Sequence, residues 1–145
     1  MLDVGQGDGI YLHTKEGTNV FFDGGSTDVS KVGTYRMLPF LKAKGVKKID
    51  YWIVSHTDAD HISGLKEVLQ AEYGIDHIVF SEYVLNDEAY QELVALAQTY
   101  GTEIFKMDCG DTLTDGEAKL RCIFPDQTYK SEDKNALSLV LCYED

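Results

Sequence analysis

The residues with the clearest chemistry lie in the segment SHTDADHISG, residues 55–64. This segment places His56, Asp58, Asp60 and His61 within six positions. Imidazole and carboxylate together suit zinc, manganese or iron, and the carboxylate oxygens move preference away from metals that favour purely thiolate sites. In the structural alternative, one aspartate caps a helix and the two histidines are satisfied polar residues. A cap needs one such residue and not four, so the pattern predicts a metal site.

The elements expected around this segment would bring the four side chains together. The preceding run KIDYWIVS is short and almost wholly apolar, which predicts a strand covered on both faces. His56 then follows the carboxyl end of that strand, where open α/β sheets place their ligands. In an extended segment residues 56, 58 and 60 would project to the same side. His61 would begin the turn into a helix expected from about Ile62 to Glu72.

The rest of the chain alternates strands and helices, without a linker or an internal repeat. GIYLHT and NVFFDGG predict two strands joined as a hairpin by KEGT. A helix is expected from about Val29 to Lys44, bent or restarted at Pro39 and closed by Gly45. NDEAYQELVALAQTYG predicts a further helix, with Asn86 as its cap and Gly101 at its end. Further strands are expected at HIVFS, TEIFKM, KLRCIFP and ALSLVLCYE. This order predicts an α/β sandwich rather than a doubly wound nucleotide fold.

Composition is that of one ordinary globular domain, residues 1–145, with 43% hydrophobic and 26% charged residues. The three cysteines, Cys109, Cys122 and Cys142, are far apart and never form a CxxC pair, so we expect buried, inert thiols. No apolar run approaches membrane-spanning length, and MLDVGQGDG has neither a basic start nor an apolar signal core. The chain as given is therefore expected to be soluble.

Charge is unevenly distributed along the chain. The net charge of −12 opposes loose electrostatic binding to nucleic acid or to anionic lipid. Residues 31–48 nevertheless hold six lysine or arginine residues and no acidic residue, so this segment carries +6 and the remainder −18. A solvated helix face explains such a cluster, and a stripe that follows a phosphate backbone is the functional alternative.

The glycine-rich start GQGDG does not predict a nucleotide site. It precedes an expected strand instead of joining a strand to a helix, and no GK[ST] follows it. We expect these glycines to let the backbone approach another segment closely.

At these motifs the chain resembles the metallo-β-lactamase superfamily. SHTDADHISGL is similar to its HxHxDH signature, in the HxDxDH form found in the extracellular domain of ComEC-type DNA-uptake (competence) proteins. Blocks similar to that family also occur, in order and at suitable spacing, at LDVGQGDGIYLHT, NVFFDGG, MLPFLKAKGVKKIDYWIVSH and NALSLVL. The resemblance covers essentially the whole chain and implies an αββα sandwich.

The resemblance also implies roles for the motif residues. His56 and Asp58 would hold a first metal ion, and Asp60 and His61 a second, with zinc or manganese as the metals. Asp60 would in addition lie near the attacking hydroxide, as the catalytic residue. Two divalent ions against the charges of Asp58 and Asp60 would leave a locally positive pocket for phosphates.

Supporting roles are implied for four residues before the motif. Asp23 of FFDGG would support the metal-binding loop without binding metal, although a turn residue before two glycines is an equal alternative. Asp3, Gln6 and Asp8 would lie on the rim of the site, beside the ligands or the substrate, and none of them is expected to be a catalyst.

The activity implied is metal-assisted hydrolysis, most specifically by a nuclease or phosphodiesterase domain of a ComEC-type protein that acts on DNA. Such a domain would lie on the extracytoplasmic side of the bacterial membrane, as part of a membrane protein. A hydrolase of another small phosphoester and a non-catalytic remnant or interaction module are the alternatives.

The family's later ligands, a bridging aspartate and a final histidine in an HHG-like block, find no match before Asp145. We therefore expect the first half of the sandwich, catalytically silent by itself and a weak binder of metal. We also expect an uncovered sheet face around Ile53 and Leu139, and self-association through it.

Overall fold

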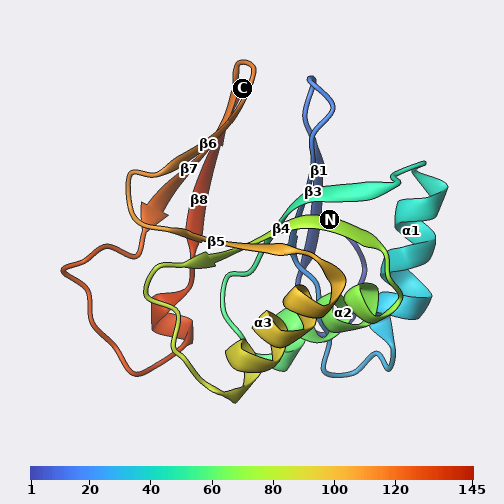
Figure 1. Ribbon diagram of the computed structural model, residues 1–145, viewed down its shortest axis with the longest axis horizontal. Helices are drawn as coiled ribbons and strands as arrows, with labels where there is room; N and C mark the ends of the chain where they lie inside the picture. Colours follow the sequence, from blue (N-terminus) through green and yellow to red (C-terminus); the bar gives the residue numbers. More distant parts are fainter.

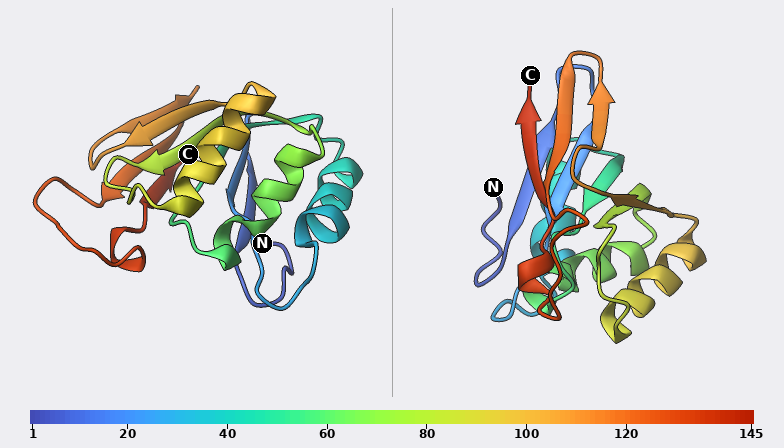
Figure 2. Two further views of the ribbon diagram at one scale, coloured as in Figure 1. Left: turned by 60° about the horizontal axis from the view of Figure 1, so that its bottom comes forward. Right: turned by 90° about the vertical axis from the view of Figure 1, so that its left-hand side faces the viewer.

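Alternate side chains along the central strands face two different cores, and this alternation accounts for the layers of the molecule. The computed structural model describes residues 1–145 as two packed β-sheets with helices on the outer face of the larger one (Figure 1). Figure 2 shows the smaller sheet on one side and helices α2 and α3 on the other. The predicted α/β sandwich is confirmed, with the layers helix, sheet and sheet.

The larger sheet has five strands in the order β1-β2-β3-β4-β5. β1 pairs antiparallel with β2, from Gly9 opposite Asp23 to His13 opposite Asn19, so the predicted hairpin is confirmed. The pairs β2–β3, β3–β4 and β4–β5 are parallel. The bounds are β1 Gly9–His13, β2 Asn19–Asp23, β3 Lys48–Ile53, β4 Gly74–Ser81 and β5 Glu103–Met107.

The smaller sheet is antiparallel and contains one strand that was not expected. Its strands are β6 (Thr112–Asp115), β7 (Ala118–Phe124) and β8 (Val140–Glu144), in that order. The expected strands in KLRCIFP and ALSLVLCYE correspond to β7 and β8. β6 reads TLTD, and its four mostly polar residues carry too little hydrophobic pattern to predict an edge strand.

The helices differ from expectation at their amino-terminal ends. The first helical segment begins at Gly33 and not near Val29, and it consists of a π-helical turn followed by α1. α2 begins at Ala59, three residues before the expected start, and α3 is capped by Asp87 and not by Asn86. The bounds are η1 Gly33–Met37, α1 Leu38–Ala43, α2 Ala59–Gln70, α3 Glu88–Tyr100 and the short η2 Asn135–Leu137.

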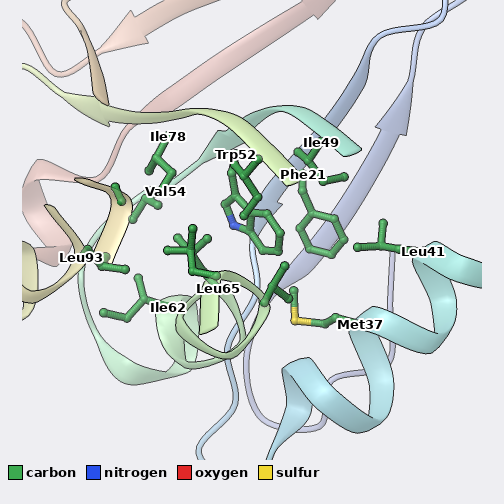
Figure 3. Packing of buried hydrophobic residues seen from close by; sticks show 14 of the residues in the cluster. Phe21, Met37, Leu41, Ile49, Trp52, Val54, Ile62, Leu65, Ile78 and Leu93 are labelled. Atoms are coloured by element: carbon green, nitrogen blue, oxygen red, sulfur yellow. The ribbon is translucent and has the colours of Figure 1, made fainter. Parts of the chain in front are cut away.

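One core lies between the helices and the larger sheet. It contains 19 buried residues, and Figure 3 shows Phe21 and Trp52 at its centre, with Met37 and Leu65 approaching from the helices. The rings of Phe21 and Trp52 stack with their centroids 4.5 Å apart. Trp52 also donates its Nε1–H to the carbonyl oxygen of Asp23 at 2.7 Å, so the buried indole is satisfied.

A second core lies between the two sheets and corrects the expected open face. Ile53 and Leu139 are 2% and 6% exposed, because β7 and the segment before β8 cover β3 from that side. The expectation of a wholly uncovered face is therefore wrong, but self-association of the chain stays a prediction, because both side chains also line a groove that is open. What is open is an apolar groove of ≈ 400 Å³ between β1 and β8, the edge strands of the two sheets.

The cysteines differ from one another in their exposure. All three cysteines are free, but only Cys122 is buried, whereas Cys109 is exposed and Cys142 is half-buried. None of the helices is both long enough and apolar enough to cross a bilayer.

Gly64 allows α2 to pack against the end of β2, and this contact generates a test of the fold. The backbone N–H groups of Gly64 and Leu65 both donate to the carbonyl oxygen of Gly24, and a Cβ at position 64 would lie 2.6 Å from that oxygen. Gly64→Ala should therefore lower the free energy of unfolding by about 1–3 kcal/mol, as overpacking does, measured by urea denaturation. Gly74→Ala, at the exposed start of β4, is the control, because a Cβ there would come within 3.1 Å of Cβ of Lys48 but no nearer than 3.8 Å to a backbone atom. It should change the free energy of unfolding far less. Equal effects would contradict this packing argument.

Candidate metal centre

The HTDADH motif lies where β3 ends and α2 begins. His56 follows β3 by three residues, whereas Asp60 and His61 already belong to the first turn of α2. The expectation that residues 56, 58 and 60 project together from an extended segment is therefore wrong, because the helix begins at Ala59. The helical turn still brings the imidazoles together, with ring centroids of His56 and His61 3.8 Å apart.

Asp23 orients His61. Its carboxylate oxygen Oδ2 lies 3.0 Å from Nδ1 of His61 and accepts a hydrogen bond from Oγ of Ser55 at 2.7 Å. A carboxylate only accepts, so Nδ1 of His61 carries a hydrogen, and in the neutral ring Nε2 keeps its lone pair. That Nε2 faces Oδ2 of Asp60 at 3.6 Å and Oδ2 of Asp8 at 3.9 Å. The ring is thus held with its free nitrogen toward two carboxylates.

His56 also directs its Nε2 atom toward a carboxylate of the motif. Its Nδ1 lies 3.1 Å from Oγ of Ser55 and 3.3 Å from Oγ of Ser138, and its Nε2 lies 3.7 Å from Oδ2 of Asp58. The side chain is only 9% exposed, so the ring is fixed by its surroundings. Both histidines therefore offer Nε2 as a ligand atom.

Asp58 occupies the N-cap position of α2 but does not cap the helix with its side chain. Its Oδ1 lies 3.4 Å from Nζ of Lys134, and its Oδ2 accepts from Nδ2 of Asn135 at 3.4 Å. The alternative in which the side chain of Asp58 caps the helix is therefore wrong. Lys134 also lies 2.8 Å from Asp87, and the hydrogen bond to Asp87 is the main cause that raises the pKa of Lys134, with Asp58 contributing.

Three glycines let the backbone segments of the site meet. A Cβ at Gly7 would contact the backbone oxygen of Gly25 and lie 2.7 Å from that of Asp60. A Cβ at Gly25 would lie 2.6 Å from the backbone nitrogen of His61, and Gly24 has a φ of +128°. The GQGDG and DGG segments thus pack against the start of α2, as the close-approach expectation for GQGDG requires.

The three expected rim residues are placed differently from one another. Asp8 lies beside His61, with its side chain 50% exposed. Asp3 is 85% exposed and ion-paired with Arg36 at 3.1 Å. Gln6 bonds to Asp28 and Thr27 through its backbone, and no hydrogen bond joins its side chain to the four motif residues. The structure therefore places Asp8 beside the ligands, pairs Asp3 with Arg36 instead, and gives the side chain of Gln6 no hydrogen bond to the motif.

The two histidines titrate in opposite directions. Burial, followed by the charge of His61, lowers the pKa of His56. Burial is also the largest single influence on His61 and lowers its pKa, but the hydrogen bond and charge of Asp23, with the charges of Asp60 and Asp8, outweigh it and raise the pKa overall. His56 is therefore neutral near pH 7, and His61 keeps a proton to a higher pH than an ordinary histidine.

The donor set fits a divalent cation. One ligand atom each from His56, Asp60 and His61 lies within 4.8 Å of the others, and the same holds for Asp8, Asp23 and His61. Two imidazoles with a carboxylate are the ligands that zinc and manganese take in proteins. Asp58 lies outside both groups, and His61 belongs to both.

Some residues of the site were not identified from the sequence. Ser55 links Asp23 to both histidines, and Lys134, Asn135 and Ser138 approach from the far end of the chain. A signal existed for two of them, because Asn135 and Ser138 lie in the NALSLVL block.

The layers, together with a histidine–aspartate cluster at the carboxyl end of β3, define a metal-binding α/β sandwich. The sequence matches the model of the metallo-beta-lactamase superfamily over residues 2–89, and the chain belongs to this superfamily. The family implies divalent metal ions as cofactors, in agreement with the clustered imidazoles and carboxylates.

A curated relative is ComE operon protein 3 of Bacillus subtilis (strain 168), which is 27% identical over 157 residues. The match covers 99% of this chain but only 20% of that protein, so the chain spans about a fifth of the relative's length.

Solved structures show the same fold at low sequence identity. The metallo-beta-lactamase fold protein YhfI from Bacillus subtilis aligns with a TM-score of 0.55 at 16% identity, over 95% of this chain and 48% of that one. CmlA, a diiron beta-hydroxylase from Streptomyces venezuelae, aligns with a TM-score of 0.55 at 15% identity, over 97% and 28%. These likenesses establish the fold and not the reaction.

The Asp23–His61 contact predicts a measurable titration shift. Asp23→Asn removes the negative charge beside Nδ1, so the pKa of His61 should fall in the metal-free protein. Nuclear magnetic resonance of the imidazole signals against pH would measure the change, with the His13 and His77 signals as internal references. An unmoved His61 titration would show that Asp23 does not act on this ring.

Proposed function

We propose that this chain is the metal-dependent phosphodiesterase domain of a ComEC-type DNA-uptake protein, with DNA as its substrate. The observation that carries the proposal is the compact group of His56, Asp60 and His61 ligand atoms at the end of β3. Likeness to ComE operon protein 3 along 99% of the chain supports the competence setting. In that setting the domain would lie on the extracytoplasmic side of the bacterial membrane.

The residue roles in this proposal are those that the family pattern implies. His56 and Asp58 would hold one ion, and Asp60 and His61 the other, with zinc or manganese as the candidate metals. Such ions lower the pKa of a bound water and offset charge on a phosphodiester. Asp60, with a side chain 36% exposed, would orient the attacking water at the mouth of the site. Asp23 would keep Nε2 of His61 directed toward that mouth.

The charge at the site differs from the positive pocket that was expected. Asp8 and Asp23 join Asp58 and Asp60 around the histidines, so four carboxylates would balance two divalent ions. With one ion the site would keep two negative charges and repel a phosphate. Binding of DNA therefore requires both ions or basic residues elsewhere on the protein.

The basic segment 31–48 can supply such residues, but at a distance. Lys44 and Lys47 are exposed, form no ion pair, and line an open groove of ≈ 780 Å³ together with Tyr11 and Phe40. This groove lies where β3 begins, whereas the metal centre lies where β3 ends. Five residue steps at ~3.3 Å place the two ends of β3 about 17 Å apart. A nucleic acid would span them with about five phosphates at the spacing of B-DNA.

The first test concerns the motif. In the protein as its gene encodes it, Asp60→Ala should abolish cleavage of DNA and of a chromogenic phosphodiester with zinc or manganese, with the fold retained by circular dichroism. Glu117→Ala, at an exposed position in the turn between β6 and β7, is the matched loss of one acidic residue and should remain active. Undiminished cleavage by Asp60→Ala would exclude this site.

The same assay separates the alternative functions. Cleavage of the small diester without cleavage of DNA would indicate a small phosphoester as the substrate. Absence of both activities in the metal-loaded wild-type protein would favour a non-catalytic interaction module.

The second test concerns the basic groove. Lys44→Glu combined with Lys47→Glu should weaken binding of an oligonucleotide longer than about five phosphates and reduce its salt slope by about one per lost contact. Cleavage of the small diester should be unchanged, because that substrate cannot reach the groove. An unchanged salt slope would indicate that these lysines belong to a solvated surface and do not contact DNA.

A further inference from the structure

A loop from the end of the chain closes one side of the metal centre. Residues 134–139, which we call the Lys134 loop, contact residues 55–58 at four points. Three are the bonds of Lys134 and Asn135 to Asp58 and of Ser138 to His56, and the fourth is the backbone N–H of Leu139, which donates to the carbonyl of Ser55 at 2.9 Å. Leu137 and Leu139 are buried, so apolar packing holds the loop in place.

Asp58 is the one motif residue whose carboxylate is bound by this loop. Its ligand atoms lie outside both groups of clustered donors, although Oδ2 is only 3.7 Å from Nε2 of His56. Each of its oxygens already has a partner in the Lys134 loop. Lys134 is also the only lysine or arginine whose side chain forms an ion pair with one of the site's aspartates Asp8, Asp23, Asp58 and Asp60.

We propose that Lys134 is an internal cation that holds Asp58 in the metal-free protein and competes with a divalent ion for that carboxylate. A metal ion between Nε2 of His56 and Oδ2 of Asp58 would lie within a few ångströms of the Lys134 ammonium and would repel it. The ammonium has a second and closer partner, since Asp87 lies 2.8 Å away against 3.4 Å for Asp58. Lys134 can therefore release Asp58 to a metal ion and stay bound to Asp87.

This proposal rests on the metal-binding role of His56 and Asp58 in the proposed function, but its test needs no cleavage of any substrate. A merely structural role for Lys134 predicts the opposite result. If the ammonium only positions Asp58, its loss should weaken metal binding, as loss of a group that orients a ligand does. If it competes with the metal, its loss should strengthen metal binding.

Calorimetric titration of the chain with zinc and with manganese distinguishes the two roles. Lys134→Met removes the charge and keeps the length of the side chain, and Lys134→Gln removes the charge but keeps a hydrogen-bond donor. Both variants should bind metal at least about tenfold more tightly than the wild type, because a like charge a few ångströms from the ion is removed. Lys134→Arg, which keeps the charge, should bind like the wild type.

Lys130→Met is the matched control, because it removes an exposed positive charge four residues away that forms no ion pair. It should leave the metal affinity unchanged. Weaker or unaltered metal binding by Lys134→Met and Lys134→Gln would overturn the proposal, and so would equal tightening by Lys130→Met. Tighter metal binding by these variants, together with no phosphodiester cleavage by the metal-loaded protein as its gene encodes it, would instead support the competition and refute the proposed function.

A double-mutant cycle gives a second measurement of the same competition. Asp87→Asn keeps a capping side chain for α3 but removes the second of the two carboxylates that pair with Lys134. In the wild-type background it should weaken metal binding more than in the Lys134→Met background, because only the former has an ammonium left to return to Asp58. Equal effects in both backgrounds would contradict the release of Lys134 to Asp87.

Discussion

The carboxylate of Asp23 is the contact on which the geometry of the site depends. It accepts hydrogen bonds from the backbone and hydroxyl groups of Ser55 and lies against Nδ1 of His61, so it joins the end of β2, the end of β3 and the start of α2. Its residue has a φ of 54°, in the left-handed region that an aspartate tolerates better than most residues. The chain leaves β2 after Asp23, while the carboxylate of Asp23 stays in contact with Nδ1 of His61.

Close backbone contact is the second condition for this arrangement. Gly24 accepts two backbone hydrogen bonds from α2 through its carbonyl, and Gly7 and Gly25 leave no room for a side chain between three segments. Larger residues there would move α2, and with it Asp60 and His61, away from His56. Gly7, Gly24 and Gly25 therefore serve the metal centre through backbone packing.

The sequence allowed prediction of features that depend on local pattern. The β1–β2 hairpin, the buried β3 and the Gly101 end of α3 follow from alternation, apolar runs and a left-handed cap. The metal-binding motif was visible because its ligands lie within six residues. The exact start of α2 was not, since residues 58 to 60 carry no pattern that distinguishes a strand extension from a first helical turn.

Contacts between distant segments could not be predicted in the same way. Nothing in the spacing of Lys134 and Asp58, 76 residues apart, indicates that they meet, and the cover over Ile53 depends on β7 and on Leu139. The supporting role of Asp23 was available only from the family resemblance. Tertiary packing decides such contacts, and it also decides which of the four motif residues are free to bind metal.

The most direct measurement of the central claim is the position of a bound ion. Crystals of the protein grown with zinc or manganese, with data collected at the absorption edge of the metal, would locate it by anomalous scattering. The account predicts one peak within bonding distance of Nε2 of His56 and a carboxylate oxygen of Asp58, and a second within bonding distance of Nε2 of His61 and a carboxylate oxygen of Asp60, with Asp23 still on Nδ1 of His61. A peak elsewhere, or His61 turned so that Nδ1 binds the metal, would contradict it.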